Sequence, residues 1–206
     1  RAAEKTDKLD PLLPVMARID GHKFSTFTKG FRRPFDERLH HAMVLTARDL
    51  MMQFNAATAY TQSDEITLVW RANSEDQTPM YGGRILKTST LLAGFASVRF
   101  AYHMQRVEWE DDGSITADRV RAKLADPFVH FDARVFNVPD TEEAYVNVMW
   151  RAAFDCPRNA MSTLARAHYR HKPLQGLSTK QMMEKLETEK GIKWLEQPAA
   201  FRCGTT

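Results

Sequence analysis

Two short apolar runs separated by a polar turn place the strongest constraint on the fold of this chain. Residues 58–60 and 66–70 are rich in β-branched and aromatic side chains, which favour strands. Residues 62–64 between them are glutamine, serine and aspartate, which favour turns. The stretch therefore predicts a β-hairpin that presents Asp64 and Glu65 at its tip.

Other periodic segments lie on both sides of this hairpin. Residues 15–19 read as a strand, residues 84–103 as a helix, and residues 131–138 alternate as a strand does. A first helix over residues 36–54, with Asp36 as its N-cap, has one apolar stripe at the helical period. The stripe consists of Leu39, Met43, Thr46, Ala47, Leu50, Met51 and Phe54. The order β-α-β-β-α-β predicts an α/β (α+β) fold, the ferredoxin-like palm of many nucleotidyl-transferring enzymes.

The remaining apolar side chains indicate where these elements pack. Phe24, Phe27 and Phe31 have helical spacing over residues 23–31, and packing into the core is favoured over stacking on bases. On the second helix we expect one apolar face, formed by Leu91, Phe95, Val98 and Tyr102.

The last third of the chain is predicted to be mostly helical. A helix over residues 141–153 is followed by a new helix that starts at Pro157. Ser178 and Gln181 fit a capping box, and that helix should end near Gly191. Residues 194–203 are expected to return as a short strand or hairpin. We therefore divide the chain into a palm-like catalytic domain, residues 1–139, and a helical C-terminal part, residues 140–206, packed on the palm.

Composition limits the classes of function. The 206 residues carry a net charge of +3, which permits an anionic partner such as RNA without requiring one. No apolar run is long enough to span a bilayer and the first residues lack an apolar signal core, so we expect no membrane association and a cytoplasmic location. Cys156 and Cys203 form neither a metal-like pair nor a disulfide framework.

Carboxylates follow two of the predicted strands. Asp20 and Gly21 end the first strand, and Asp64 and Glu65 lie at the hairpin tip. Adjacent strand ends of this kind can hold Mg²⁺, which takes one or two carboxylates plus substrate phosphates. The alternative is that these aspartates are ordinary turn residues. In the metal hypothesis Asp20 and Asp64 are bridging ligands of two ions, the carbonyl of Gly21 is a third ligand, and Glu65 is a supporting ligand.

Three segments carry a family resemblance: residues 18–28, residues 33–36 and residues 62–65, in that order and spacing. Together they resemble the tRNA-histidine guanylyltransferase family, which includes the guanylyltransferase-like 3′-to-5′ polymerases. The resemblance implies two Mg²⁺ ions, ATP and GTP as substrates, tRNA as partner and a homo-oligomer, a tetramer in the family. It also implies that Asp20, Gly21 and Asp64 hold the metal.

Nucleotide contacts are implied at several further positions. Backbone amides at the start of a helical segment bind triphosphate oxygens, which suits the loop after the first carboxylate. Ser63 corresponds to a nucleotide-contacting serine, and Arg33 stands where the family usually has lysine. Arg84 and Lys87 are candidates for a second triphosphate, with a solvated helix face as the alternative. The predicted nucleotide-binding residues are Asp20, Gly21, His22, Lys23, Phe24, Ser25, Arg33, Ser63, Asp64, Arg84 and Lys87.

A departure from the family pattern bears on the substrate. Arg151, Arg158 and Asn159 lie in a segment that resembles the family's RNA-binding element, but Pro157 replaces its histidine. In the family the histidine accompanies guanylylation of histidine tRNA. Its absence makes the chain more similar to the branch that repairs 5′-truncated tRNAs.

Two alternatives remain open from the sequence. A palm-type nucleotidyl cyclase would use the same carboxylates on a single nucleoside triphosphate without RNA. A non-catalytic RNA-binding module would have carboxylates that serve only as turn residues. A cyclase would turn over nucleotide without RNA, whereas the tRNA nucleotidyltransferase needs RNA. A non-catalytic module would respond to Mg²⁺ only through RNA folding.

Overall fold

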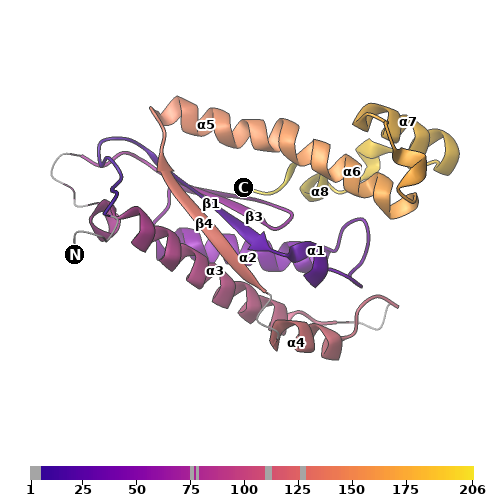
Figure 1. Ribbon diagram of the computed structural model, residues 1–206, viewed down its shortest axis with the longest axis horizontal. Coiled ribbons are helices and arrows are strands. Elements are labelled where there is room, and N and C mark those ends of the chain that lie inside the picture. The colour runs from indigo at the N-terminus through magenta and orange to yellow at the C-terminus, as the bar shows by residue number, and fades with distance from the viewer. Residues whose placement is uncertain (1–5, 75–76, 78, 110–112, 126–128) are drawn as a thin grey trace.

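The central sheet has the predicted ferredoxin-like topology. The computed structural model describes residues 6–74, 77, 79–109, 113–125 and 129–206. Within them, four antiparallel strands are arranged in the order β2-β3-β1-β4 (Figure 1). Each long helix joins two strands that have a third strand between them, which is the split βαβ connection. The strands are β1 (Val15–His22), β2 (Thr58–Gln62), β3 (Glu65–Trp70) and β4 (His130–Asn137).

Helices α2 (Glu37–Gln53) and α3 (Ile85–Arg106) cover one face of this sheet (Figure 1). The carboxylate of Asp36 accepts hydrogen bonds from the amides of Arg38 and Leu39, so the predicted N-cap is confirmed. The predicted stripe of α2 also faces the core. Its buried members are Met43, Thr46, Ala47, Leu50 and Phe54.

The predicted apolar face of α3 is only partly correct: Phe95 packs on the core, with its ring centroid 5.5 Å from that of Phe54. Val98 is 69% exposed, and Leu91 and Tyr102 are exposed as well. The helix carries apolar residues around its whole circumference, so apolar spacing alone did not identify the face that packs on the sheet. The residues that are buried are Thr88, Leu92, Ala96, Phe100, His103 and Met104.

Three phenylalanines after β1 lie in the core as predicted. Phe24, Phe27 and Phe31 are buried, and the ring centroids of Phe24 and Phe100 lie 5.2 Å apart. The helix there is shorter than predicted, because only α1 (Phe24–Phe27) forms. Gly30, in a left-handed conformation, marks the turn that follows.

The other face of the sheet carries a helical arm, which we define as α5 (Thr141–Trp150), the π-helical turn η2 (Arg151–Asp155) and α6 (Cys156–His168). The three form one continuous helix (Figure 1), so the predicted break before Pro157 is wrong. The amide of Cys156 bonds the carbonyl of Arg151, five residues back. This wider turn lets the chain pass the proline, which has no N–H to continue the usual ladder.

The end of the chain packs against the arm. The helices there are η3 (Lys172–Leu174), α7 (Thr179–Lys190), η4 (Trp194–Glu196) and α8 (Ala199–Cys203). The capping box of Ser178 and Gln181 is confirmed, and α7 ends at Gly191. The strand predicted over residues 194–203 is wrong, because this segment forms η4 and α8. Only Thr205 pairs as a bridge, with Thr61 at the edge of β2.

The short elements η1 (Met80–Gly83) and α4 (Ala117–Ala125) are among those that were not predicted. The sequence Glu-Asp-Asp-Gly of residues 110–113 also favours a turn, but only Gly113 of this stretch lies among the described residues. In the described part of the chain, no helix has the length and apolar character needed to cross a membrane.

Candidate active site

The two predicted metal-binding aspartates lie at one end of the central strands. Asp20 is near the end of β1, and Asp64 belongs to the two-residue turn between β2 and β3. The amide of Gly21 donates a hydrogen bond of 3.0 Å to the carbonyl of Asp64. Ser63 takes the left-handed conformation that this tight turn requires. The backbone therefore fixes the two aspartates relative to each other.

The carboxyl group of Asp64 is in an unfavourable place for an anion. Burial raises its pKa, the negative charges of Asp20 and Glu65 raise it further, and the hydrogen bond with Ser63 lowers it in part. A cation placed beside Asp64 and Asp20 would offset both the burial and the repulsion.

A row of acidic residues crosses the sheet at this end. Asp20 is directly opposite Glu65 on β3 and directly opposite Asp132 on β4. Directly opposed residues of antiparallel strands point to the same face of the sheet, which here is the face that carries the helical arm. Asp132 was not predicted, because its position depends on the strand register. Its place in the alternating pattern of residues 131–138 was the only signal in the sequence.

The loop after Asp20 makes a sharp turn into α1. A Cβ on Gly21 would lie 2.3 Å from the ring of Phe24, so glycine is required by close approach. Lys23 is left-handed, and the amides of Phe24 and Ser25 are the first of the helix and have no intrahelical partner. The predicted phosphate-binding amides are therefore adjacent to the carboxylates. The side chain of His22 stacks on His130 across β1 and β4, at 4.6 Å between ring centroids.

Glu65 is held by two arginines. Its carboxylate is 3.2 Å from Arg18 on β1 and forms an ion pair with Arg151 of the arm. Arg151 also contacts Asp155. Glu65 is thus committed to a network within the protein, while Asp20 beside it is exposed.

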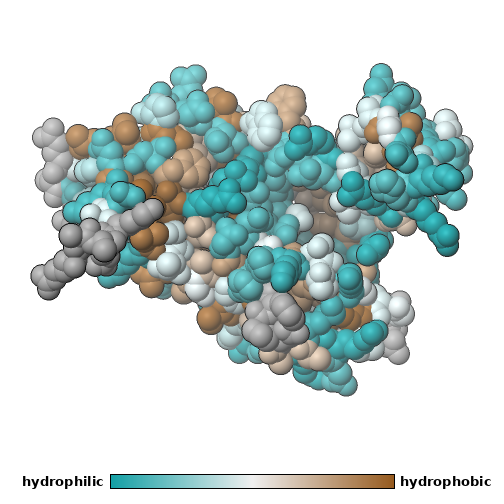
Figure 2. Space-filling view, viewed as in Figure 1, coloured by the Kyte–Doolittle hydropathy of each residue, from teal (hydrophilic) through white to brown (hydrophobic). Residues whose placement is uncertain are grey.

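The other predicted residues are distributed over the surface. Arg158 and Asn159 are exposed on α6, and Arg33 is exposed in the loop before α2. In the view of Figure 2, the middle of the molecule below the helical arm is mostly hydrophilic.

The structure does not bring Arg84 and Lys87 to the carboxylates. Arg84 pairs with Lys8 in an isolated β-bridge, and the carbonyl of Gly83 accepts a hydrogen bond from the amide of Leu9. Lys8 and Leu9 belong to the segment that precedes the start of β1. Asp20 lies towards the other end of that strand. Figure 1 likewise shows the start of α3 near the N-terminus and far from α1. Within one chain, a nucleotide at Asp20 is beyond their reach.

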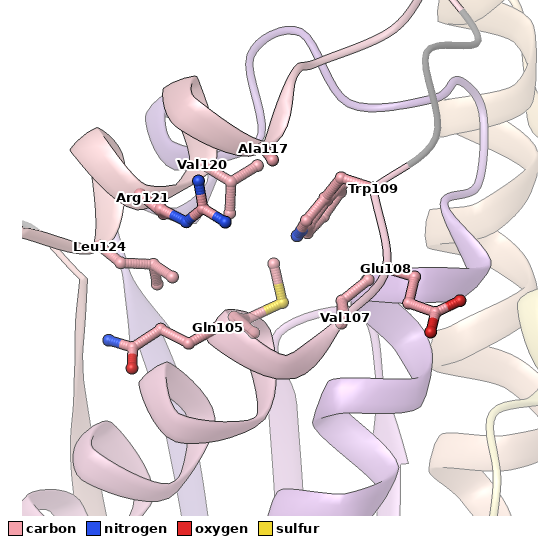
Figure 3. Close-up of a pocket in the computed structure, with 9 residues that line it drawn as sticks. Gln105, Val107, Glu108, Trp109, Ala117, Val120, Arg121 and Leu124 are labelled. Atoms are coloured by element: carbon pink, nitrogen blue, oxygen red, sulfur yellow. The ribbon is translucent and has the colours of Figure 1, made fainter.

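A cavity of about 320 Å³ lies where the end of α3 meets α4 (Figure 3). Trp109 and Arg121 lie on opposite sides of it, and Met104 contributes to its lining. The lining residues in the described part of the chain include none of the predicted site residues. The chemistry of the carboxylates, and not the size of this cavity, therefore locates the candidate active site.

A ferredoxin-like sheet with carboxylates at the end of its central strands is the architecture of palm-type nucleotidyltransferases. A family model described as tRNAHis guanylyltransferase (Thg1) matches residues 1–139. The chain belongs to this family and is a nucleotidyltransferase, which confirms the family and the class of enzyme predicted from its motifs.

The chain is similar to one uncharacterized viral protein and to two solved structures of a guanylyltransferase-like description. An uncharacterized protein, R259, of Acanthamoeba polyphaga mimivirus is 32% identical over 96% of this chain and 70% of its own length. A bacterial tRNA(His) guanylyltransferase-like protein in complex with ATP superposes with a TM-score of 0.83 at 30% identity, over 97% of this chain and 79% of that one. A structure with the same description, in complex with GTP, superposes with a TM-score of 0.72 at 26% identity, over 96% of this chain and 76% of that one.

Proposed function

We propose that this enzyme adds nucleotides to the 5′ end of tRNA in the 3′-to-5′ direction, with Mg²⁺ and with ATP and GTP as substrates. The observation that carries the proposal is the backbone-fixed pair of Asp20 and Asp64, in which burial and neighbouring charge disfavour the Asp64 anion. ATP and GTP are the molecules bound in two similar bacterial structures.

The residues at this site fit Mg²⁺. The carboxylates of Asp20 and Asp64, with the carbonyl of Gly21, would hold the metal. Within the described residues no three histidine, cysteine or acidic side chains are arranged to hold an ion alone. Mg²⁺ is commonly bound by one or two carboxylates together with substrate phosphates. A Mg²⁺ ion held by these groups would lower the pKa of the attacking hydroxyl and neutralise charge on the phosphates.

The chain's own groups orient the reactants. The amides of Phe24 and Ser25 are positioned to bind phosphate oxygens, and Ser63 lies beside Asp64 at the turn. In the transfer step the 3′-hydroxyl oxygen of the incoming nucleotide bonds to the 5′ phosphorus of the RNA. AMP leaves if ATP has first adenylylated a 5′-monophosphate, and pyrophosphate leaves if the RNA carries a 5′-triphosphate.

The substrate we propose is a tRNA that lacks its first 5′ nucleotide. Pro157 in place of the family's histidine favours this repair activity over exclusive guanylylation of histidine tRNA. By the same family resemblance we propose a homo-tetramer, which light scattering of the purified protein would test. We also propose a cytoplasmic location.

The deciding experiment is incubation with Mg²⁺, ATP, labelled GTP and a truncated tRNA, scored for a product one nucleotide longer. We expect the formation of labelled product to depend on the opposing base of the tRNA. Product on full-length histidine tRNA alone would overturn the repair proposal and leave the guanylylation activity. Pyrophosphate release from nucleotide without RNA would indicate a cyclase instead.

A further inference from the structure

Five charged residues of alternating sign form a chain from the sheet to the surface of the arm. Glu65 lies between Arg18 and Arg151, and Asp155 lies between Arg151 and Arg158. The distances are 3.2 Å for Arg18 to Glu65, 3.3 Å for Arg151 to Asp155 and 2.9 Å for Arg158 to Asp155. Arg151 occupies the centre of this chain and bonds both carboxylates.

The arm holds both ends of the turn that carries Asp64. That turn has two residues, Ser63 and Asp64, flanked by Gln62 and Glu65. Gln62 donates a hydrogen bond of 3.1 Å to the carboxylate of Asp155, and Glu65 pairs with Arg151. Both contacts come from η2, so a single turn of the arm fixes the hairpin tip on either side.

We propose that Arg151 is a positioning residue: it holds Glu65, and through Glu65 the metal-binding Asp64, instead of contacting RNA. This inference rests on the proposed function for the role of Asp64. It also revises the RNA-binding role that the family resemblance implies for Arg151.

Burial separates Arg151 from the other arginine of this segment. Its side chain is 6% exposed, whereas that of Arg158 is 63% exposed. The Arg151 guanidinium is already paired with the carboxylates of Glu65 and Asp155. If it turned outward to bind an RNA phosphate, each of these partly buried carboxylates would lose a positively charged partner. Arg158, at the outer end of the chain, keeps its surface free for an anion.

The π-helical turn accounts for the placement of both groups. Its bond from Cys156 to Arg151 spans five residues, and Arg151 and Asp155 at its two ends both reach the sheet. Turns of this kind occur often at functional sites, because the wider register redirects side chains. Here the redirected side chains are those that hold Gln62 and Glu65.

The test is Arg151→Met, with Arg121→Met as the matched control. Arg121 is also an arginine in an ion pair, with Asp118, but on the exposed surface of α4. For Arg151→Met we expect kcat to fall about 100-fold and the Mg²⁺ concentration for half-maximal rate to rise about tenfold. The KM for RNA should stay within about twofold of wild type, since no RNA contact is removed. The control should change none of these.

A binding measurement that needs no catalytic turnover accompanies these kinetic measurements. Calorimetric titration of Mg²⁺ with GTP should show about tenfold weaker binding to Arg151→Met, whether or not any RNA is a substrate. If wild type binds Mg²⁺ with GTP but extends no RNA, the proposed function fails and the positioning role is still measured. A tenfold or larger rise in the KM for RNA, with kcat and Mg²⁺ dependence unchanged, would overturn the inference.

A double-mutant cycle with Glu65→Gln tests the route of the effect. If Arg151 acts through Glu65, Arg151→Met should lower kcat by a much smaller factor in the Glu65→Gln background than in wild type. Additive losses would contradict the proposal. Should Arg151→Met fail to fold, Asp155→Asn removes charge from the same network with little change in shape. Asp155→Asn should also raise the Mg²⁺ concentration for half-maximal rate. An unchanged Mg²⁺ concentration for half-maximal rate would overturn the inference.

Discussion

The amide nitrogen of Gly21 lies 3.0 Å from the carbonyl oxygen of Asp64, and this bond joins the end of β1 to the tip of the β2–β3 hairpin. It sets the backbone spacing of the two aspartates before any ligand binds. Asp64 as an anion is disfavoured there by burial and by Asp20. The site therefore has a cost in stability that a cation would remove.

This cost predicts opposite effects of Asp64→Asn on stability and activity. Without metal, the variant should have a higher Tm than wild type at neutral pH. The pKa of Asp64 is raised in the folded state, so its ionisation opposes folding fully above the folded-state pKa and not at all below the unfolded value of 3.8. The two melting curves should converge as pH falls towards that value. Nucleotide transfer should drop about 100-fold or more, and a variant with wild-type transfer would contradict the metal-binding role.

Asp49 should stabilise the contact between α2 and α3. The carboxylate of Asp49 accepts a hydrogen bond of 2.7 Å from Nε of Arg99. The same oxygen forms a hydrogen bond of 2.6 Å with Nε2 of His103. Burial alone would raise its pKa, but these bonds outweigh burial and hold the pKa below 3.8. Asp49→Asn should lower the free energy of unfolding by about 1–2 kcal/mol at neutral pH, because water screens part of the pairing.

The Asp49 contribution has a defined pH dependence. A depressed carboxyl pKa gives stability that is present above the unfolded value of 3.8 and is lost as pH falls through the folded value. Urea unfolding of wild type and variant at pH 7 and at pH 3 would measure it. An equal difference at both pH values would show that the pairing is not responsible.

The orientation of α3 can be measured with two truncations. Leu92 is fully buried and Val98 is 69% exposed. Leu92→Ala should lower the free energy of unfolding by about 2–5 kcal/mol, and Val98→Ala should change it by less than about 0.5 kcal/mol. Thermal or urea unfolding checks both. The reverse order would place the predicted face, and not the observed one, against the sheet.

Gly204 should be required for docking of the C-terminus on β2. It has φ of 75°, and an added Cβ would lie 2.6 Å from the hydroxyl of Tyr60. Gly204→Ala should lower the free energy of unfolding by about 2–4 kcal/mol, from strain and overpacking together. Gly176, with φ of 80° and no described atom within 4 Å of a built Cβ, is the matched control. Gly176→Ala should lower the free energy of unfolding by about 1 kcal/mol, from backbone strain alone. Equal losses in the two variants would show that the contact with Tyr60 does not contribute.

The sequence by itself determined the order and type of the elements around the site. Alternation and helical periodicity are local properties, so β1, α2, the hairpin and β4 were predictable, as were the N-cap Asp36 and the capping box at Ser178. The family motifs, which are also local, located Asp20 and Asp64. The same locality explains the correct prediction that Phe24, Phe27 and Phe31 are buried.

Only the tertiary structure decided which of these elements face each other. Strand register placed Asp132 opposite Asp20, and packing against the sheet selected the Leu92 face of an α3 that is apolar all round. The π-helical turn accommodates Pro157, but only the tertiary structure brings Arg151 of this turn to Glu65 on the sheet. Side chains distant in sequence are brought together by burial and charge pairing, which act through space and not along the chain.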